Sequence, residues 1–193
     1  MRSIAVFCGS SEGYLEQYRE IAYELGAMLA AKGIRIIYGG AKIGLMGALA
    51  DGALSNGGQV IGVIPDFLQT KEVTHEGLTE LVLVQTMHER KIKMHELSNG
   101  VITLPGGWGT MDELFEMLTW AQLGLHHKPI GLLNVLGYYE AFQAFIDSMV
   151  REGFLAEDVS KILLMSDSID DLLEQMNQYV APELPRVINK QTI

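Results

Sequence analysis

The sequence predicts an α/β fold, with a single Rossmann-like domain in which helices cover both faces of a doubly wound parallel sheet. Two observations carry this prediction. Short apolar runs alternate with helical patterns along the chain, which is typical of βαβ units joined by right-handed crossovers. Glycine turns follow the runs that end at Cys8, Tyr38 and Leu104, and sheets of this class bind ligands beyond the carboxyl ends of strands near the topological switch point.

In the first half of the chain, each predicted element begins or ends at a recognisable signal. The apolar run 3–8 is a buried strand, and helix 14–31 carries one apolar stripe and stops at Gly33. Strand 34–38 leads through two glycines into helix 45–55, which an Asn-Gly-Gly sequence ends. Strand 59–64 is closed by a proline, and residues 66–79 are predicted to be irregular.

The second half continues the same alternation. The predicted strands are 81–84, 101–104, 129–133 and 162–165, and the predicted helices are 87–97, 110–123, 138–151 and 169–179. No repeat, linker or low-complexity segment interrupts this order. Residues 1–181 are therefore predicted to form the one domain, and 182–193 a polar and loose tail.

Composition bounds the class of protein. The 193 residues are 48% hydrophobic and 20% charged, which is ordinary for a globular protein with a sizeable core. The formal net charge of −10 argues against a general nucleic-acid binder, which needs a basic face. No apolar run is long enough for a membrane span or a secretory signal, so a cytoplasmic location is expected. Cys8 is the single cysteine and is expected to be a small buried hydrophobe.

The most informative segment is Pro105-Gly106-Gly107-Trp108-Gly109-Thr110-Met111-Asp112-Glu113. It joins a strand to a helix, and the free N–H groups and dipole of a helix N-terminus favour an anion. Its glycines let the backbone approach a bound group closely. A competing interpretation needs no ligand, because Thr110 and Glu113 also have the form of a capping box. A cap does not call for three preceding glycines, so a phosphate cradle is favoured.

Two further features could contribute to the same site. Arg90 and Lys91 lie in a charged cluster that a solvated helix face would explain, although Arg90 could instead face the cleft and bind phosphate or carboxylate. The turns Gly9-Ser10-Ser11 and 39–47 are either plain turns or additional donors. Both lack the dinucleotide fingerprint, and the second lacks the Lys-Ser/Thr ending of a P-loop. The five histidines show no metal-ligand spacing, so no metal is expected.

The predicted helix 110–123 is apolar on nearly all sides. Such a helix is buried on more than one side. It lies either deep within the domain or under a second subunit, and a homodimer that packs near this helix is expected.

Together these residues resemble the LOG ("Lonely guy") family of cytokinin riboside 5′-monophosphate phosphoribohydrolases, which older annotation labels lysine decarboxylases. The resemblance runs from the first strand to about Pro129, and its combination of motifs is specific although each motif alone is weak. The matching segments are Cys8-Gly9-Ser10-Ser11, Tyr38-Gly39-Gly40, Gly44-Leu45-Met46-Gly47, Gly62-Val63-Ile64-Pro65, Met87-His88-Glu89-Arg90-Lys91 and Pro105-Gly106-Gly107-x-Gly109-Thr110-x-x-Glu113.

The resemblance implies a Rossmann-like dimer that hydrolyses a nucleoside 5′-monophosphate to free base and ribose 5-phosphate, without metal or redox cofactor. It implies Arg90 and Glu113 as the catalytic pair. The substrate- and phosphate-binding residues that it implies are Gly9, Ser10, Gly39, Gly40, Gly44, Glu72, Met87, Lys91, Gly106, Gly107, Trp108, Gly109, Thr110 and Thr119.

The chemistry agrees with this assignment. Cleavage of an N-glycosidic bond passes through an oxocarbenium-like transition state, which a carboxylate can stabilise or for which it can activate water. Arg90 would keep Glu113 ionised. The sequence leaves two rival functions: a non-catalytic carrier or sensor of a phosphorylated ligand, and a lysine decarboxylase, which needs a Schiff-base lysine in an apolar pocket.

Overall fold

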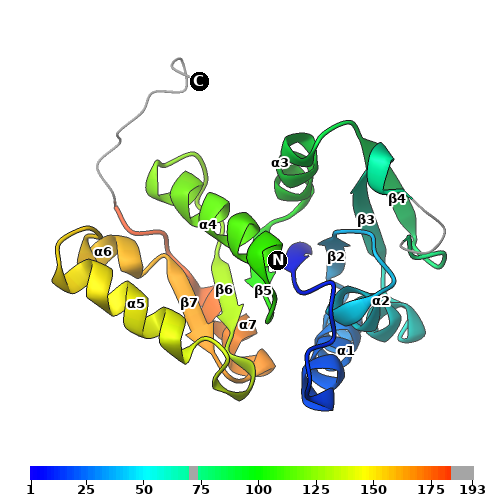
Figure 1. The fold of residues 1–193 in the computed structure, drawn as a ribbon, viewed down its shortest axis with the longest axis horizontal. Helices are drawn as coiled ribbons and strands as arrows, with labels where there is room; N and C mark the ends of the chain where they lie inside the picture. Colours follow the sequence, from blue (N-terminus) through cyan, green and yellow to red (C-terminus); the bar gives the residue numbers. More distant parts are fainter. Residues whose placement is uncertain (70–73, 184–193) are drawn as a thin grey trace.

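The computed structural model describes residues 1–69 and 74–183, and within them seven parallel strands form one sheet in the order β4-β3-β2-β1-β5-β6-β7 (Figure 1). This confirms the α/β class that the alternation of apolar runs and helical patterns predicts. The strands are β1 (Ser3–Phe7), β2 (Arg35–Tyr38), β3 (Val60–Pro65), β4 (Glu80–Val84), β5 (Gly100–Thr103), β6 (Ile130–Leu133) and β7 (Leu163–Ser166).

Helices cover both faces of the sheet, and each face has its own apolar core. One core joins alternate strand residues to helices α1, α2 and α7, and the other joins the intervening strand residues to α3, α4 and the start of α5. Both strand faces are apolar because both are covered, as is usual for parallel sheets. The helices are α1 (Glu16–Ala31), α2 (Gly44–Ser55), α3 (Met87–Leu97), α4 (Trp108–Gln122), α5 (Glu140–Arg151), α6 (Glu157–Ser160) and α7 (Ile169–Gln178).

The structure differs from the sequence prediction in a few short segments. The segment predicted to be irregular contains the 3₁₀ turn η1 (Asp66–Leu68) and an isolated bridge between Ala41 and Thr74. A second 3₁₀ turn, η2 (Val135–Gly137), and the one-turn helix α6 also lack a predicted counterpart. None of the helices in the described part of the chain is long and apolar enough to cross a membrane.

The strand order changes direction between β1 and β5. These two strands pair from Ile4 opposite Gly100 to Phe7 opposite Thr103. After β1 the chain turns to α1 on one face, and after β5 it turns to α4 on the other. The two departing loops leave a crevice at the carboxyl ends of the strands, which is where open α/β sheets bind ligands.

Candidate active site

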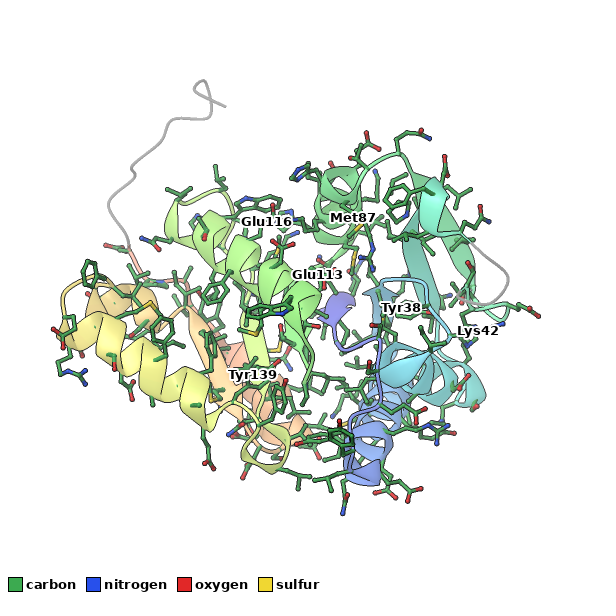
Figure 2. All side chains as sticks on the ribbon, viewed as in Figure 1. Tyr38, Lys42, Met87, Glu113, Glu116 and Tyr139 are labelled. Atoms are coloured by element: carbon green, nitrogen blue, oxygen red, sulfur yellow. The ribbon has the colours of Figure 1, made fainter. Side chains whose placement is uncertain are left out.

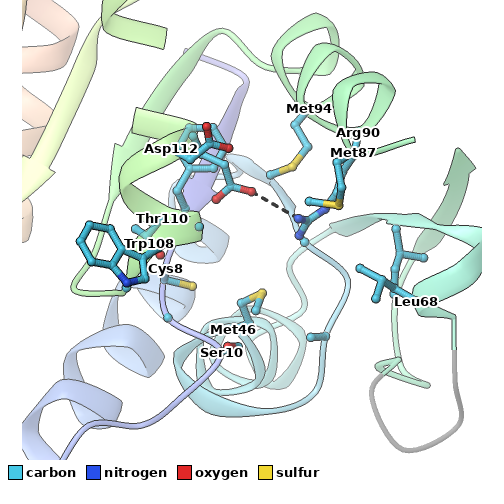
Figure 3. A pocket seen from close by; sticks show the side chains of 18 of the residues that line it. Cys8, Ser10, Met46, Leu68, Met87, Arg90, Met94, Trp108, Thr110 and Asp112 are labelled. Carbon is cyan, nitrogen blue, oxygen red and sulfur yellow. Dashed lines mark hydrogen bonds and ion pairs between the residues drawn. The ribbon is translucent and has the colours of Figure 1, made fainter. Parts of the chain in front are cut away.

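A cavity of about 520 Å³ lies at this crevice. The glycine turns after β1, β2 and β5 each contribute to its wall, as the sequence predicts, and helices α3 and α4 face each other across it (Figure 3). Its lining residues are Val6, Phe7, Cys8, Gly9, Ser10, Gly39, Ala41, Ile43, Met46, Ile64, Phe67, Leu68, Met87, Arg90, Met94, Gly107, Trp108, Gly109, Thr110, Asp112 and Glu113.

The open N-terminus of α4 forms one wall of the cavity. The helix begins at Trp108, and Gly107 occupies the N-cap position without a side-chain hydrogen bond. The capping-box interpretation is therefore wrong: Thr110 lies inside the first turn, and Glu113 makes an ion pair with Arg90. Because the first N–H groups of a helix have no partner within it, and no side chain caps them here, this end favours an anion.

The glycine turn before α4 is held closely against the turn after β1. The Gly9 N–H donates to the Pro105 carbonyl at 3.0 Å. A methyl group on Gly106 would collide with the Thr110 hydroxyl group and lie 2.9 Å from the Gly9 nitrogen, so this approach requires glycine.

Two tyrosines from the β6–α5 connection brace the same turn from behind. The Tyr138 hydroxyl donates to the Gly106 carbonyl at 2.7 Å, and the buried Tyr139 hydroxyl donates to the Leu104 carbonyl at 2.8 Å. The sequence analysis missed both residues, because nothing in their local pattern shows that they reach a loop more than 30 residues away.

Arg90 projects from α3 into the cavity. Its Nε donates to the Val63 carbonyl at 3.0 Å, and its Nη1 lies 3.4 Å from Glu113 Oε1 (Figure 3). The Arg90 side chain is 12% exposed, and its guanidinium packs where a methyl group on Gly39 would be. The interpretation of this cluster as a solvated helix face is therefore wrong for Arg90, although Lys93 on the same helix forms an exposed pair with Glu96.

The first turn of α3 is fixed by its own cap. The Thr86 hydroxyl accepts from the Glu89 N–H at 3.1 Å, and Glu89 Oε2 accepts from the Gln85 N–H at 2.7 Å. This arrangement orients Arg90, one residue after Glu89. The pattern Thr-x-x-Glu is visible in the sequence, but the sequence analysis overlooked it.

Burial controls the charge of Glu113. The carboxyl is enclosed between α3, α4 and the end of β1, with its side chain 11% exposed. Burial raises the pKa of Glu113 to about 7, against the opposing effect of Arg90 and with a further upward contribution from Asp112. Arg90 favours the ionised carboxyl, as expected, but burial outweighs it and moves the pKa of Glu113 up toward neutral pH.

Cys8 lines the cavity at the end of β1 without being activated. Burial first, and then the nearby Glu113, raise the pKa of its thiol, so the sulfur stays protonated at neutral pH. This agrees with its expected role as a small buried hydrophobe.

The wall opposite α4 is apolar. It combines side chains of the β2–α2 loop and α2 with those of η1 and α3: Ile43, Met46, Phe67, Leu68, Met87 and Met94. Phe67 is 64% exposed, although large apolar residues are usually buried. The sequence analysis named only Met87 of this group as a substrate-binding residue. It treated the glycine-rich segment 39–47, which contains Ile43 and Met46, as a source of backbone donors.

Several predicted site residues lie outside the cavity lining. Gly40 and Gly44 have positive φ angles and shape the β2–α2 turn, where a methyl group on Gly44 would collide with the Ser10 backbone. Gly106 lines an adjoining hollow of about 310 Å³ that also includes Gly9, Ser10 and Tyr138. Glu72 lies outside the described residues.

Thr119 and Lys91 have other partners. The Thr119 hydroxyl donates to the Phe115 carbonyl at 2.7 Å, and its side chain lines a separate apolar hollow between α4 and α5. The Lys91 ammonium lies between α3 and α4, within 3.1 Å of Asp112 Oδ2 and 3.0 Å of Glu116 Oε2. In the described parts of the chain, no group of three or more histidine, cysteine, aspartate or glutamate side chains is arranged to hold a metal ion.

Comparisons with known proteins show which sequences this chain resembles. A family model described as possible lysine decarboxylase matches residues 46–176. The cytokinin riboside 5′-monophosphate phosphoribohydrolase LOG of Oryza sativa is 47% identical over 179 residues, which cover 93% of this chain and 74% of that protein. Its relative LOG1 of Arabidopsis thaliana is 44% identical over 191 residues, 99% of this chain and 89% of that protein.

Solved structures with the same fold are more distant in sequence. A molybdenum cofactor binding protein of Rippkaea orientalis superposes with a TM-score of 0.69 at 21% identity, over 92% of this chain and 96% of that one. The molybdenum cofactor carrier protein of Chlamydomonas reinhardtii gives a TM-score of 0.67 at 20% identity, with the same shares covered.

Proposed function

We propose that this chain, which belongs to the LOG family of cytokinin riboside 5′-monophosphate phosphoribohydrolases, hydrolyses the N-glycosidic bond of an N6-modified purine nucleoside 5′-monophosphate. The products are the free base and ribose 5-phosphate. The observation that carries the proposal is the pairing of Arg90 with a buried Glu113 in one cavity, one turn from an open helix N-terminus.

The cavity has a place for each part of such a substrate. The phosphate binds at the first turn of α4, where Gly107, Gly109 and Thr110 line the wall and the helix dipole favours an anion. The ribose lies beside Arg90 and Glu113. The modified base points toward the apolar wall that includes Met46 and Leu68. Phosphate binding away from the bond that breaks supplies positioning energy for the reaction.

Glu113 acts on the attacking water. In its ionised form it removes a proton while the water oxygen bonds to the anomeric carbon, and the C–N bonding pair leaves with the purine. The proton that Glu113 gains equals the one that the leaving purine needs, so the overall reaction balances. A pKa of about 7 matches a general base at neutral pH.

A decarboxylase of the pyridoxal phosphate type has less support. It needs a lysine in an apolar pocket for the Schiff base. No lysine is found among the described residues that line the cavity, and Lys91 pairs with two carboxylates outside it.

The test is an assay of liberated bases from a panel of nucleoside monophosphates. We expect release from AMP or from N6-substituted AMP, and a loss of several orders of magnitude in Glu113→Gln and Arg90→Ala while the fold survives. Lys93→Ala, which breaks an exposed pair on the same helix, is the control and should retain activity. Near-normal release by either site variant would reject the assignment. Tight binding without release, measured by calorimetry, would instead identify a carrier.

We also propose that a second copy of the chain covers the outer face of α4. Phe115 on α4 and Phe154 after α5 are exposed and line the apolar hollow of about 240 Å³ between these helices, and Phe145 on α5 is exposed as well. Several large exposed apolar side chains around an apolar hollow favour an interaction site. Sedimentation at micromolar concentration should give a dimer mass, and Phe115→Glu should give monomers. A monomeric parent protein would contradict this proposal.

A further inference from the structure

Two neighbouring residues of α3 place their cations in different surroundings. Arg90 points into the cavity, whereas the Lys91 side chain is 8% exposed and directed into the α3–α4 interface. Its Nζ lies 3.1 Å from Asp112 Oδ2 and 3.0 Å from Glu116 Oε2, so two carboxylates occupy the ammonium. Figure 2 shows Glu113 and Glu116 on the side of α4 that faces α3.

On α4, Glu116 is three residues after Glu113 and four after Asp112, so it neighbours both carboxylates on the helix surface. Like charges at this spacing repel one another. Only two cations face this group among the described residues, Arg90 at Glu113 and Lys91 at the other two carboxylates.

We propose that Lys91 is a positioning residue: it neutralises Asp112 and Glu116, fixes α4 against α3, and thereby governs the state of Glu113 without contacting the substrate. The proposal rests on Glu113 being the catalytic carboxylate of the proposed function. It assigns Lys91 a role different from the substrate contact that the family resemblance implies.

The charges around Glu113 support this role. Besides burial and the contribution of Arg90, the pKa of Glu113 is raised by Asp112 and Glu116 and lowered by Lys91. The Cys8 thiol, which lies near Glu113 just after β1, is neutral because burial raises its pKa. Removal of the Lys91 charge therefore both deletes a cation and leaves two carboxylates without their partner, and both changes favour protonated Glu113.

The experiment measures Glu113 directly. In protein labelled with ¹³C-glutamate, the side-chain carboxyl signal of Glu113 is identified by its loss in Glu113→Gln and is then titrated with pH. Lys91→Met keeps the length of the side chain without its charge, and should raise the pKa of Glu113 by about 1. Lys91→Arg should keep the parent value. Lys93→Met, which removes an exposed lysine from the same helix, is the matched control.

Two further variants keep the test decisive if Lys91→Met fails to fold. Glu116→Gln, which removes one repelling carboxylate, should lower the pKa of Glu113 below the parent value. The double variant Lys91→Met, Glu116→Gln should have a Glu113 pKa between that of Lys91→Met and that of the parent protein.

Kinetics separates positioning from substrate binding. In Lys91→Met the pH at which kcat/KM reaches half its plateau should rise together with the Glu113 titration, and KM should change by less than about threefold. An unchanged Glu113 titration combined with a KM raised tenfold or more would overturn the proposal and make Lys91 a substrate contact. If no nucleotide is hydrolysed, the proposed function fails, but the titration still decides the role of Lys91.

Discussion

A single methyl group at Gly39 should disable the site while leaving the fold intact. Gly39 begins the turn after β2, and its φ is not in the left-handed region, so alanine fits the backbone. The added carbon would overlap the end of the Arg90 guanidinium, and it would lie 3.2 Å from Arg90 Cζ and 2.9 Å from Met46 Sδ. Both neighbours are the far ends of flexible side chains, so they can move.

The size of the effect follows from that movement. Ordinary contact between such atoms is about 3.5–4.0 Å, so the overlapped guanidinium nitrogen must retreat by about 1.5–2 Å. Its contact with Glu113, 3.4 Å in the parent protein, then lengthens or breaks. A misplacement of about 1 Å already costs roughly 10²-fold in turnover, so kcat for base release at saturating nucleotide should fall by at least about that factor.

Gly131→Ala is the matched control for the added methyl group. At that position in β6 the new carbon would meet Met176 Sδ at the same 2.9 Å, on the far helix α7. In both variants the free energy of unfolding, measured in urea, should fall by about 1–2 kcal/mol because the added methyl group overpacks its surroundings. Only the Gly39 variant should lose turnover. Parental kcat in Gly39→Ala, or an equal loss in both variants, would refute the reasoning.

Four further outcomes are expected. Arg90→Gln removes the cation nearest Glu113, so the half-maximal pH of kcat/KM, from initial rates between about pH 5 and 11, should rise by about 1–3. Because the pKa of Glu113 is raised from 4.5 to about 7, the folded protein binds one more proton than the unfolded chain between those pH values. The free energy of unfolding, measured by urea titration, should therefore fall by up to about 3 kcal/mol in the parent relative to Glu113→Gln as pH rises from 4.5 to 7. Burial lowers the pKa of both His95 and His126 from 6.5 to about 4, so the free energy of unfolding should fall by about 1–3 kcal/mol as pH falls across this range. In His95→Phe the free energy of unfolding should depend less steeply on pH. Tyr139→Phe should cost about 1–2 kcal/mol in urea unfolding, since a buried carbonyl loses its donor.

The sheet was predictable because its signals are local. Apolar runs, glycine turns and helical stripes each lie within about a dozen residues, and together they determine strands, helices and the crevice at the switch point. The same signals located the turn after Leu104 and placed Arg90 near it. They did not locate η1, whose Phe67 and Leu68 line the cavity from a segment without periodicity.

The remaining errors concern contacts between elements that are distant in the chain. Whether Arg90 or Lys91 enters the cavity depends on the rotation of α3 about its axis, which its cap and the Val63 carbonyl settle. The protonation of Glu113 depends on how deeply three separate elements enclose it, and the nearby arginine suggests the opposite result. Local residue patterns contain no information on the rotation of α3 or on the depth at which Glu113 is buried.

Because the strand order reverses between β1 and β5, turnover requires both sides of the sheet to be folded and paired. Arg90 lies on α3, which follows β4 on one side of that reversal, and Glu113 lies on α4, which follows β5 on the other side. The pairing of β1 with β5 connects the two sides. Neither half of the chain carries a working pair alone. During refolding, base release should therefore return only after β1 has paired with β5. The circular dichroism signal of the helices, which each half can regain by itself, should return earlier.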